Sequence, residues 1–561
     1  YEYYDEWMRR ELNMTEAPIP YLYGGWMREE FSMTEAPEPE PLSPSPGDWV
    51  VNGTEVRENE VIILTGNLVV ESGGNLTLIN CTLYMNCTYD GEWQIRVESG
   101  GIMNVLKGSN ITAYNPNYEF LFYVYGRLIM RDSFLSRCGY RFAYPGLWLE
   151  TNEYVTIKNC TISQNFVGIH IHRCNLTITN CTINSNWCGI NIYMESSSNI
   201  TISRCIISNN DIGIFRFGPL LKSTGQVTQV TVYGSTIAGN RLGIYVLTAD
   251  DCNLTVHNCT IRFNIDGIRV VGKCTAQVHF NNIYDNYGYA IIRQEVIKIL
   301  YLYSEGPDAV RIINVTSMVN ATYNYFGGIP ELDGDSIGGG VIYRPYFTEP
   351  LILWTPPLPF TPVIINEGDY MKLTGDIKLD GPILVRYGGS LVVNNATINA
   401  NGYSIGGKLG SEFTINKSTI FNYHFMALRT SSATIYYTTI DYGGPLCIIA
   451  CSPLILHSTI KSVEGIYLEG KADLLLFNCN IVDILKGIRC SMSNLTLHSC
   501  TIFNHTVYNF IAPDLICIDS TNITIFNCSL SYWGILFFNS TNVIISKCDI
   551  SNIVGTYDIL F

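Results

Sequence analysis

Asn175-Leu-Thr-Ile-Thr-Asn-Cys-Thr-Ile183 is a phrase that returns along the chain with small changes. It recurs as Asn199-Ile-Thr-Ile-Ser-Arg-Cys-Ile-Ile207, as Asn253-Leu-Thr-Val-His-Asn-Cys-Thr-Ile261, and late as Asn494-Leu-Thr-Leu-His-Ser-Cys-Thr-Ile502. Recurrence at roughly 20–30 residues marks a stacked repeat. Because apolar and polar residues alternate within the phrase, which is the period of a strand, the repeat predicts a β-solenoid.

The side chains of the phrase divide between two faces. We expect the apolar members to point inward: Leu176, Ile178, Cys181 and Ile183. We expect the polar members to point outward: Asn175, Thr177, Asn180 and Thr182. A second phrase supplies a third strand, in which an Asn is followed three residues later by Gly-Ile, as in Asn186 and Gly189. Glycine permits the tight corner, so three short strands per turn predict a triangular, right-handed parallel β-helix with coils about 4.8 Å apart.

A further element is found near the middle of the chain. It reads Asn320-Ala-Thr-Tyr-Asn-Tyr-Phe-Gly-Gly328, followed by Asp335-Ser-Ile-Gly-Gly-Gly-Val-Ile-Tyr-Arg-Pro-Tyr346. With the repeats, it resembles right-handed parallel β-helix proteins of the pectate-lyase-like superfamily, above all archaeal cell-surface members related to the periplasmic copper-site maturation family. The resemblance extends from Trp49 onward and implies the fold. It says little about function, because lyases, hydrolases, adhesins and structural rods share this fold.

The organisation predicts an all-β protein with two tandem right-handed parallel β-helix domains and an extended N-terminal tail. Residues 1–47 form the tail, in which Trp7-Met-Arg-Arg-Glu-Leu-Asn-Met-Thr-Glu-Ala-Pro18 is duplicated as Trp26-Met-Arg-Glu-Glu-Phe-Ser-Met-Thr-Glu-Ala-Pro37 before a Pro/Glu spacer. We place the first β-helix at 48–350, a Pro-rich linker at 351–360 and the second β-helix at 361–561. The boundary rests on a β-helix opening that occurs twice, the second time from Met371.

Composition points to an extracellular protein. Charged residues make up only 15% of the 561 residues and the net charge is −15, which disfavours nucleic acid as a partner because phosphate binding needs a basic surface. No apolar run reaches the length of a membrane span. The chain begins at Tyr1, and we expect this residue to be an N-terminus left by removal of a signal peptide. We therefore predict an extracellular or cell-surface location.

Asn-x-Ser/Thr sequons recur throughout the chain. Some arise because the repeat itself contains Asn-x-Thr, so the alternative to glycosylation is that these residues serve only the structure of the repeat. We nevertheless expect a secreted N-glycoprotein in which some sequons carry N-linked glycans. The glycosylation candidates are Asn13, Asn52, Asn75, Asn110, Asn175, Asn199, Asn253, Asn314, Asn320, Asn395, Asn416, Asn494, Asn504, Asn522 and Asn539.

The 19 cysteines would suggest disulfides in a secreted chain. Many of them occupy one equivalent inward site, however, where we expect reduced, stacked thiols that act as small apolar core residues. These are Cys160, Cys181, Cys205 and Cys259 in the first β-helix and Cys479, Cys500, Cys528 and Cys548 in the second. Cys252 and Cys274 precede their strands at matching positions one coil apart, so a disulfide between them is geometrically reasonable.

Candidate chemistry is sparse. Hydrolases with the resembled fold carry several motifs on successive coils, of which only Asp250-Asp251 is present here. His170 and His172 alternate with inward isoleucines, so we expect them on the outer, solvent-exposed face; a metal site is the alternative. Asp333-Gly-Asp335-Ser336 is similar to part of a calcium loop, which leaves calcium as an alternative. We assign no catalytic residue and no metal ligand, and we expect no cofactor.

Two features remain for function. The tail keeps large apolar residues that need a place to be buried, and the last residues before Phe561 continue the repeat without a polar cap. Solenoids need capped ends, and an open edge recruits strands. We therefore predict a non-enzymatic structural subunit of an archaeal surface filament or sheath, a homopolymer in which the tail docks on neighbouring subunits. The assembly candidates are Trp7, Met8, Met14, Trp26, Met27, Phe31, Met33 and Phe561. A secreted polysaccharide lyase or hydrolase and a glycan-binding adhesin are the alternatives.

Overall fold

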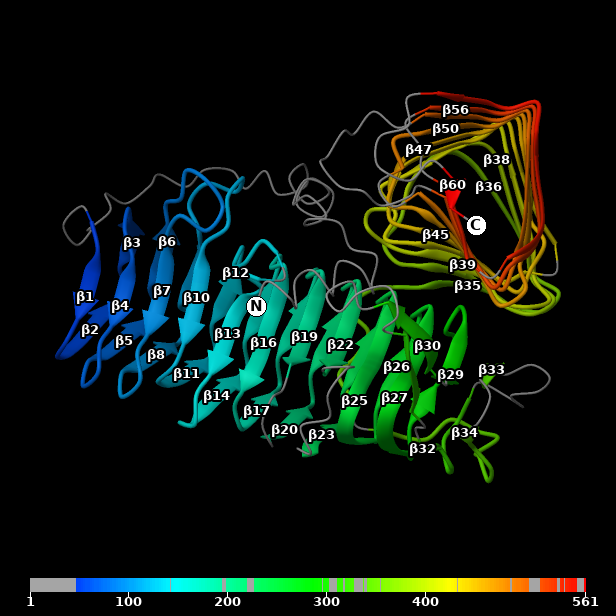
Figure 1. The fold of residues 1–561 in the computed structure, drawn as a ribbon. Coiled ribbons are helices and arrows are strands. Elements are labelled where there is room, and N and C mark those ends of the chain that lie inside the picture. The colour runs from blue at the N-terminus through cyan, green and yellow to red at the C-terminus, as the bar shows by residue number, and fades with distance from the viewer. Residues whose placement is uncertain are drawn as a thin grey trace. The chain divides into compact units, whose positions relative to one another are not determined.

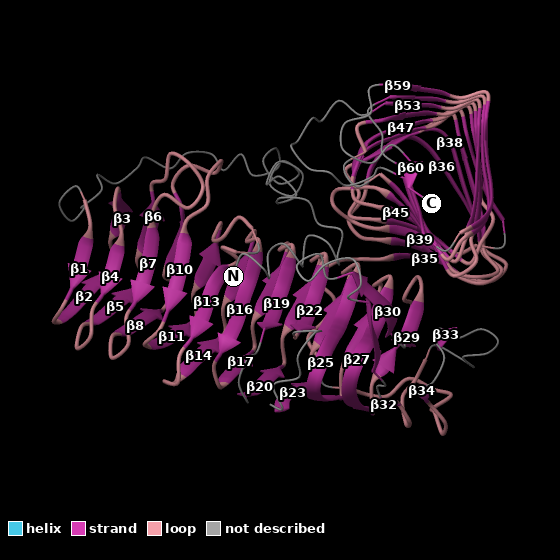
Figure 2. Ribbon diagram, viewed as in Figure 1, coloured by secondary structure: helices cyan, strands magenta, loops and turns pink. Residues whose placement is uncertain are grey.

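The computed structural model contains strands joined by loops and turns (Figure 2). It describes residues 47–141, 143–193, 198–218, 227–294, 296–301, 310–315, 318–326, 336–337, 341–353, 355–430, 432–484, 487–503, 515–531, 535–538, 540–551 and 559–560. These residues fall into two compact units that divide between Pro359 and Phe360. In total the described residues form an all-β solenoid of about 19 turns.

The first unit is a parallel β-helix with three strands per turn, and its coils follow one another from β1 to β29 (Figure 1). One turn holds a strand on each of three faces, here β17, β18 and β19. Each strand pairs in parallel with its equivalents in the turns before and after, as β17 does with β14 and β20. The predicted three-strand repeat is thereby confirmed in this unit.

The strands of the first unit are assigned to three faces. Face 1 contains β1 (Trp49–Val51), β4 (Leu68–Val70), β7 (Gln94–Val97), β10 (Leu121–Val124), β13 (Gly146–Glu150), β16 (Val167–Arg173), β19 (Cys188–Tyr193), β22 (Ile212–Phe217), the first parts of β25 (Leu242–His257) and β27 (Asp266–His279), β29 (Tyr289–Gln294) and β33 (Ser336–Ile337). Face 2 contains β2 (Thr54–Glu58), β5 (Asn75–Ile79), β8 (Ile102–Leu106), β11 (Arg127–Arg131), β14 (Val155–Lys158), β17 (Leu176–Thr179), β20 (Ser198–Ser203), β23 (Val227–Tyr233), the later parts of β25 and β27, β32 (Met318–Asn320) and β34 (Val341–Ile342). Face 3 contains β3 (Val61–Leu64), β6 (Thr82–Met85), β9 (Asn110–Ala113), β12 (Phe134–Ser136), β15 (Thr161–Ser163), β18 (Thr182–Asn184), β21 (Ile206–Ser208), β24 (Thr236–Ala238), β26 (Thr260–Arg262) and β28 (Asn282–Ile283). An antiparallel pair, β30 (Val296–Tyr301) and β31 (Val310–Val315), lies outside the three faces.

The second unit is also a parallel β-helix. One face contains β35 (Val363–Ile365), β37 (Ile383–Val385), β39 (Ile405–Gly407), β42 (Met426–Leu428), β45 (Leu446–Ile449), β48 (Ile466–Glu469), β51 (Ile488–Ser491), β54 (Leu515–Ile518), β57 (Ile535–Phe538) and β60 (Ile559–Leu560). The other two are joined through β36 (Tyr370–Lys378) and β38 (Ser390–Asn399). They continue in β40 (Glu412–Asn416), β43 (Ser432–Tyr436), β46 (Leu454–Leu456), β49 (Asp473–Phe477), β52 (Asn494–His498), β55 (Thr521–Phe526) and β58 (Thr541–Ser546), and in β41 (Thr419–Phe421), β44 (Thr439–Gly443), β47 (Thr459–Val463), β50 (Asn480–Val482), β53 (Thr501–Phe503), β56 (Ser529–Ser531) and β59 (Asp549–Ser551).

The core of each unit consists of the inward side chains of its strands. The inward residues predicted from the repeat phrase, Leu176, Ile178, Cys181 and Ile183, are all buried, whereas Thr177 is exposed. Each inward residue packs on its register partner in the next coil, as Ile178 does on Ile202. The alternation in the sequence therefore predicts the core correctly, because successive side chains of a strand point to opposite faces.

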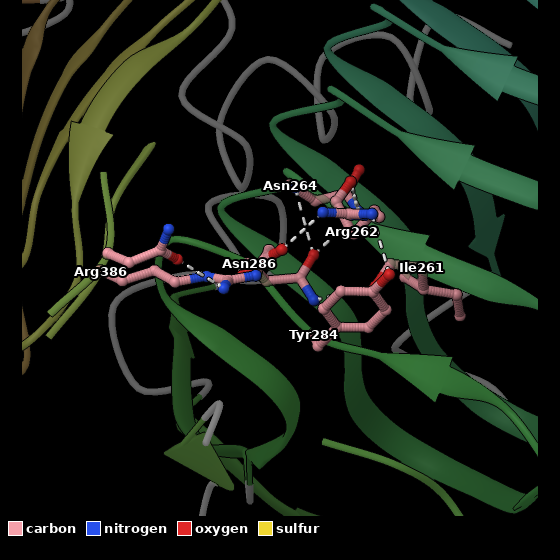
Figure 3. Close-up of polar contacts among 8 residues, drawn as sticks. Ile261, Arg262, Asn264, Tyr284, Asn286 and Arg386 are labelled. Carbon is pink, nitrogen blue, oxygen red and sulfur yellow. Dashed lines mark hydrogen bonds and ion pairs between the residues drawn. The ribbon is translucent and has the colours of Figure 1, made fainter. Parts of the chain in front are cut away.

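A ladder of buried asparagines joins the coils at the corner between face 3 and face 1. The side-chain amide of each member donates to the side-chain oxygen of the next at 3.0–3.1 Å, and its backbone N–H donates to the same oxygen. The members are Asn165, Asn186, Asn210, Asn240, Asn264 and Asn286. Figure 3 shows the last step, from Asn264 to Asn286. An asparagine buried without such partners would cost free energy, so the ladder fixes the corner of the six coils that it joins.

The repeat cysteines form a second ladder at the corner between faces 2 and 3. The backbone N–H of Cys160 donates to the thiol of Cys181 at 3.4 Å, and that of Cys181 donates to the thiol of Cys205 at 3.5 Å. In other coils a serine hydroxyl is the acceptor in place of the thiol: the N–H of Cys205 donates to Ser235 Oγ at 3.1 Å. The repeat cysteines are buried free thiols, except for Cys548, which is half-buried. They are therefore core residues, as predicted, and they also accept backbone hydrogen bonds.

Polar side chains occupy inward positions in the first coil. Glu55 and Arg57 of β2 are the register partners of Leu76 and Leu78, which are fully buried. Glu55 Oε2 accepts a hydrogen bond from the indole of Trp49 at 3.2 Å and lies 3.6 Å from Arg57. The start of the first unit is thus closed by a polar network, as solenoid ends require.

The segment interpreted from the sequence as a linker lies partly along face 3 of the first unit. Asn282 exchanges two hydrogen bonds of 2.8 Å with the backbone of Leu351. Thr260 and Thr355 share a hydroxyl hydrogen bond of 3.1 Å, and Thr236 donates to the carbonyl of Pro356. Residues 351–356 are therefore bound to the first β-helix where they are described.

Candidate interaction face

Face 1 carries a column of outward side chains, which we call the outer row. Its members are register partners, one for each coil from β7 to β27. They are Arg96, Tyr123, Trp148, His170, Asn191, Phe215, Tyr245 and Arg269. Four aromatic residues lie between Arg96 and Arg269, and the register continues beyond them to Val69 and Ile292.

The centre of the outer row is buried although it lies outside the core. Exposure of the side chains is 5% for Trp148, 1% for His170, 1% for Asn191 and 0% for Phe215. Tyr245 is half-buried. Because these exposures hold for a single chain, the centre of the outer row is covered within the protein itself and is not a free surface.

Face 2 of the same unit provides the contrast. Its corresponding outward column holds threonines, exposed or half-exposed, in the five coils from β14 to β25, with Ile129 before them and Gln277 after them. The threonines are Thr156, Thr177, Thr201, Thr231 and Thr255. Because both columns lie on one rod with the same strand geometry, the aromatic character of the outer row is a property of face 1 and does not follow from the repeat.

Ring contacts hold the outer row together. The rings of Trp148 and His170 stack with centroids 4.4 Å apart, and those of Phe215 and Tyr245 stack at 5.1 Å. Tyr123 lies 6.1 Å from Trp148. Such pairs contribute about 0.5–1.5 kcal/mol each beyond their buried area. The row is therefore a preformed platform.

A second outward column runs beside the first. His172 stacks on Tyr193 at 5.3 Å, and Tyr193 stacks on Phe217 at 5.9 Å. Glu150 connects the two columns, because its Oε2 accepts a hydrogen bond from the Trp148 indole at 3.3 Å and its Oε1 lies 3.5 Å from His172 Nδ1. The carboxylate thereby fixes the orientation of the tryptophan.

His170 and Asn191 form a polar step in the middle of the platform. Asn191 Nδ2 lies 3.2 Å from His170 Nδ1, while His170 Nε2 and Asn191 Oδ1 are buried without a hydrogen-bond partner. Burial lowers the pKa of His170 to about 3, with repulsion from His172 as the lesser cause. The ring is therefore neutral at ordinary pH. In this arrangement Nε2–H is a donor and Oδ1 an acceptor, and reversing the amide exchanges those roles.

The sequence interpretation of the two histidines was right about the face and wrong about exposure. His170 and His172 do point away from the core, yet their exposure is only 1% and 7%. Alternation reports the side of a strand on which a residue lies and not what surrounds it there. In the part of the chain that the structure describes, no group of three or more His, Cys, Asp or Glu side chains is arranged to hold a metal ion.

The Asn ladder and the corner glycines place the strands of face 1. A Cβ on Gly213 would lie 2.5 Å from the carbonyl oxygen of Gly243 and 3.2 Å from Asn240 Nδ2. Only glycine fits this approach, and the strand that begins there carries Phe215 two residues later. The same phrase with the same clearance precedes His170, Asn191 and Tyr245, so the corner fixes the position of each row member.

A cluster of contacts around Arg262 lies on face 3 near the end of the Asn ladder. Arg262 donates to the Tyr284 hydroxyl at 2.8 Å (Figure 3) and to Asp285 Oδ2 at 2.6 Å. Its guanidinium also lies 4.2 Å from the ring centroid of Phe263. These contacts engage the guanidinium within the protein, so the cluster is structural.

The second unit has two outward features of its own. On the face of β35 the outward column begins with apolar residues, Leu384, Gly406, Ala427 and Cys447, and continues with Tyr467 and Arg489. On another side a ring ladder follows successive coils with centroids 4.9–5.7 Å apart. It consists of Tyr437, His457, Phe477, His498 and Phe526. Two of the four ring contacts are stacked, one is edge-to-face and one is tilted.

The sequon asparagines are distributed over the surface. Those with described side chains are exposed or half-exposed: Asn52, Asn75, Asn110, Asn175, Asn199, Asn253, Asn320, Asn395, Asn416, Asn494 and Asn522. The side chains of Asn13, Asn314, Asn504 and Asn539 lie outside the described residues. N-linked glycosylation at the accessible positions stays a prediction.

The candidate disulfide partners are adjacent in the structure. Cys252 and Cys274 are register partners in β25 and β27, and both are buried with free thiols. Their hydrogen bond raises the pKa of Cys274, and burial adds to this effect. The pairing therefore stays a prediction for oxidising conditions.

The remaining candidates are not brought together. Asp251 lies on β25, half-buried, opposite Val227, while the side chain of Asp250 lies outside the described residues. Asp333 and Asp335 of the calcium-loop candidate are also outside them. The same holds for all assembly candidates: Trp7, Met8, Met14, Trp26, Met27, Phe31, Met33 and Phe561.

Sequence reasoning missed the outer row, although a signal for it exists. Aligning the Gly-Leu and Gly-Ile phrases puts Trp148, His170, Asn191, Phe215 and Tyr245 at one position, two residues after the glycine. Four of these five residues carry an aromatic or imidazole ring, and all five occupy a strand position that faces away from the core. Counting outward positions coil by coil would have found the row.

Comparison with known proteins concerns the fold. The family model described as "Right handed beta helix region" matches residues 47–197 and 145–295. A search for similar curated sequences found no match. Among solved structures, a PL6 family alginate lyase, AlyGC, is 11% identical and aligns over 92% of this chain and 96% of its own, with a TM-score of 0.22. A variant of that enzyme aligns over 90% and 96% with a TM-score of 0.23. These scores are too low to support an inference about activity.

No helix in the described ranges has the length and apolar character needed to cross a bilayer. The strands of both units pair in parallel from coil to coil. Together with the family match, this register identifies the chain as a right-handed parallel β-helix protein.

Proposed function

We propose that the chain is a non-enzymatic structural subunit of an extracellular surface filament or sheath, a homopolymer joined by its N-terminal tail. The observation that carries the proposal is the duplication of the tail segment, which gives one chain two similar apolar motifs. Two linked motifs of this kind are suited to joining subunits.

The tail carries apolar side chains that can form contacts between subunits. Each copy of the duplicated segment contains a tryptophan and two methionines, and burial of one tryptophan contributes roughly 2–3 kcal/mol at about 25 cal/mol per Å². Two linked copies bind more strongly than one, because the second contact is effectively intramolecular. A head-to-tail contact of this kind produces open filaments unless its rotation closes a ring.

Electron microscopy of the purified chain tests the proposal. The full chain should form filaments, and the double variant Trp7→Ala with Trp26→Ala should remain as short oligomers or single subunits. Tyr21→Ala with Tyr23→Ala is the matched control, because it removes two tail aromatics outside both copies. Filaments of normal length from the tryptophan variant, or none from the full chain, would exclude the proposal.

A further inference from the structure

We propose that the first coil of the second unit binds the same coil of a second copy of this chain. In this contact β36 pairs antiparallel with β36 of the other copy, about a two-fold axis through Thr374. The inference goes beyond the proposed function, because neither the tail nor filament formation enters it. Exposure, strand pairing and the order of charges along β36 support a second copy as the partner.

The inward side chains of the first coil of the second unit are apolar and incompletely covered. Met371 and Leu373 of β36 pack against the core, yet both are only half-buried. Their register partners in the next coil, Leu391 and Val393, are at most 1% exposed. The second unit therefore begins with core side chains that the following coil covers from one side.

The start of the first unit is built differently. Its inward positions in β2 are the charged residues Glu55 and Arg57, and a polar closure of this kind keeps a solenoid end soluble. The inward positions of β36 are apolar instead, and they include Ile377 beyond the corner. Covering such side chains with a second apolar surface is favourable because it removes them from water.

The strands of this coil also have one open edge. Among the described strands, β36 pairs only with β38 and β35 only with β37. An unpaired strand edge presents a row of N–H and C=O groups to a further strand. Because β36 is nine residues long, whereas strands usually have about five or six, it offers an extended edge for such pairing.

The charges of β36 are arranged for pairing with a copy of itself. Lys372 and Asp376 are exposed and lie at equal distances before and after Thr374. In antiparallel pairing centred on Thr374, Lys372 of each copy lies opposite Asp376 of the other. Charges on an edge strand usually discourage pairing, but opposite charges facing each other across two strands stabilise it. The same register places the inward Met371 opposite the inward Ile377, so the apolar side chains of the two copies also meet.

The shape of the coil is compatible with this axis. β36 crosses a corner, because its register with β38 shifts just before Gly375, whose φ is +77°. A two-fold axis through the corner exchanges the two faces that meet there and reverses the direction of their strands. Ile364, at the centre of β35, lies half a coil before Thr374. The axis therefore passes through the middle of the third face, where β35 pairs antiparallel with itself.

Charge reversal in the full chain tests the contact. Trp7→Ala with Trp26→Ala is the background, so that the tail does not add to the association that is measured. Sedimentation velocity at low salt, where charge pairs are least screened, gives the dissociation constant of the dimer. It is measured for Lys372→Asp, for Asp376→Lys, for the double variant and for an equimolar mixture of the two single variants. Circular dichroism and melting check that each variant is folded, and Lys417→Asp is the matched control at an exposed lysine of another coil.

We expect each single reversal to weaken the dimer about tenfold or more, because two attractive pairs become two repulsive pairs. The double variant and the mixture should recover the affinity of the background, since both again place opposite charges at positions 372 and 376 of the two copies. Lys417→Asp should leave the affinity unchanged.

Crosslinking at the axis provides a second measurement. Thr374→Cys places a thiol opposite the same residue of the other copy, within the range that a disulfide spans. With oxidised glutathione as the oxidant, this variant should form a disulfide between two chains, whereas Ser432→Cys, at an exposed position on β43, should not.

A dimer that all charge variants form equally well would place the contact elsewhere and overturn the proposal. Single subunits for every variant, without a crosslink at position 374, would also overturn it, because another part of the same chain would then cover the coil. Either result leaves the proposed function standing, since the tail tryptophans are absent from every sample in the comparison.

Discussion

The side-chain amide of Asn186 donates a hydrogen bond of 3.0 Å to the side-chain oxygen of Asn210, which lies one coil further along the rod. Neither residue touches solvent appreciably, with exposures of 1% and 0%. Buried amides in such a series polarise one another and are costly to break. The contact between these two residues therefore links the stability of one coil to that of the next.

Loss of one ladder asparagine should destabilise the first unit strongly. Asn210 donates to Ile183 O and Asn240 Oδ1 and accepts from the N–H and the amide of Asn186. Asn210→Leu leaves several buried groups unpaired, so the free energy of unfolding should fall by about 3 kcal/mol or more. Asn199 is exposed, so the free energy of unfolding of the Asn199→Leu variant should stay within about 0.5 kcal/mol of that of the parent protein. Equal melting temperatures for the two variants would show that the ladder contributes little.

The cysteine ladder predicts a difference between two substitutions of similar size. Cys181→Ser keeps an acceptor for the N–H of Cys160, as Ser235 does for Cys205, and should change stability by less than about 1 kcal/mol. Cys181→Val leaves that N–H unpaired and should cost a further ~1–3 kcal/mol. Denaturation curves of both variants provide the measurement. If valine is tolerated as well as serine, the cysteines are only space-filling residues.

Acid should weaken the first unit through His170. Burial lowers its pKa from 6.5 to about 3, so between these values the unfolded chain binds a proton that the folded chain does not. Above pH 6.5 this difference does not affect the free energy of unfolding. As the pH falls from 6.5 toward 3, the free energy of unfolding decreases by up to about 1.4 kcal/mol per pH unit. His170→Asn should flatten the dependence of unfolding on pH in this range. An unchanged slope in the variant would assign the acid sensitivity to other groups.

The fold could be predicted from the sequence because it depends on local alternation. Leu176, Ile178 and Ile183 are separated by polar residues that can only face outward, and the structure has them buried. The surroundings of outward residues could not be predicted in the same way. His170 and Thr177 both alternate with inward aliphatic residues, yet one is buried and the other exposed, because the difference arises between faces of the rod.

The polar ladders were also beyond the sequence interpretation. The recurring Asn and Gly, as in Asn186 and Gly189, were recognised as a corner signal. A polar residue beside a turn is usually solvated, however, and only stacking of the coils brings Asn186 and Asn210 into contact and removes both from water. Contacts between residues separated by a whole turn depend on the register of the stack.

Competition by the isolated tail tests the central claim most directly, because every subunit remains intact. A synthetic peptide of residues 1–46 is added to dissociated subunits before assembly, and filament lengths are measured by electron microscopy. If tails join subunits by docking on their neighbours, the peptide should shorten filaments in proportion to its concentration. The same peptide with Trp7→Ala and Trp26→Ala should leave their length unchanged. Filaments of equal length with either peptide would contradict assembly through the tail.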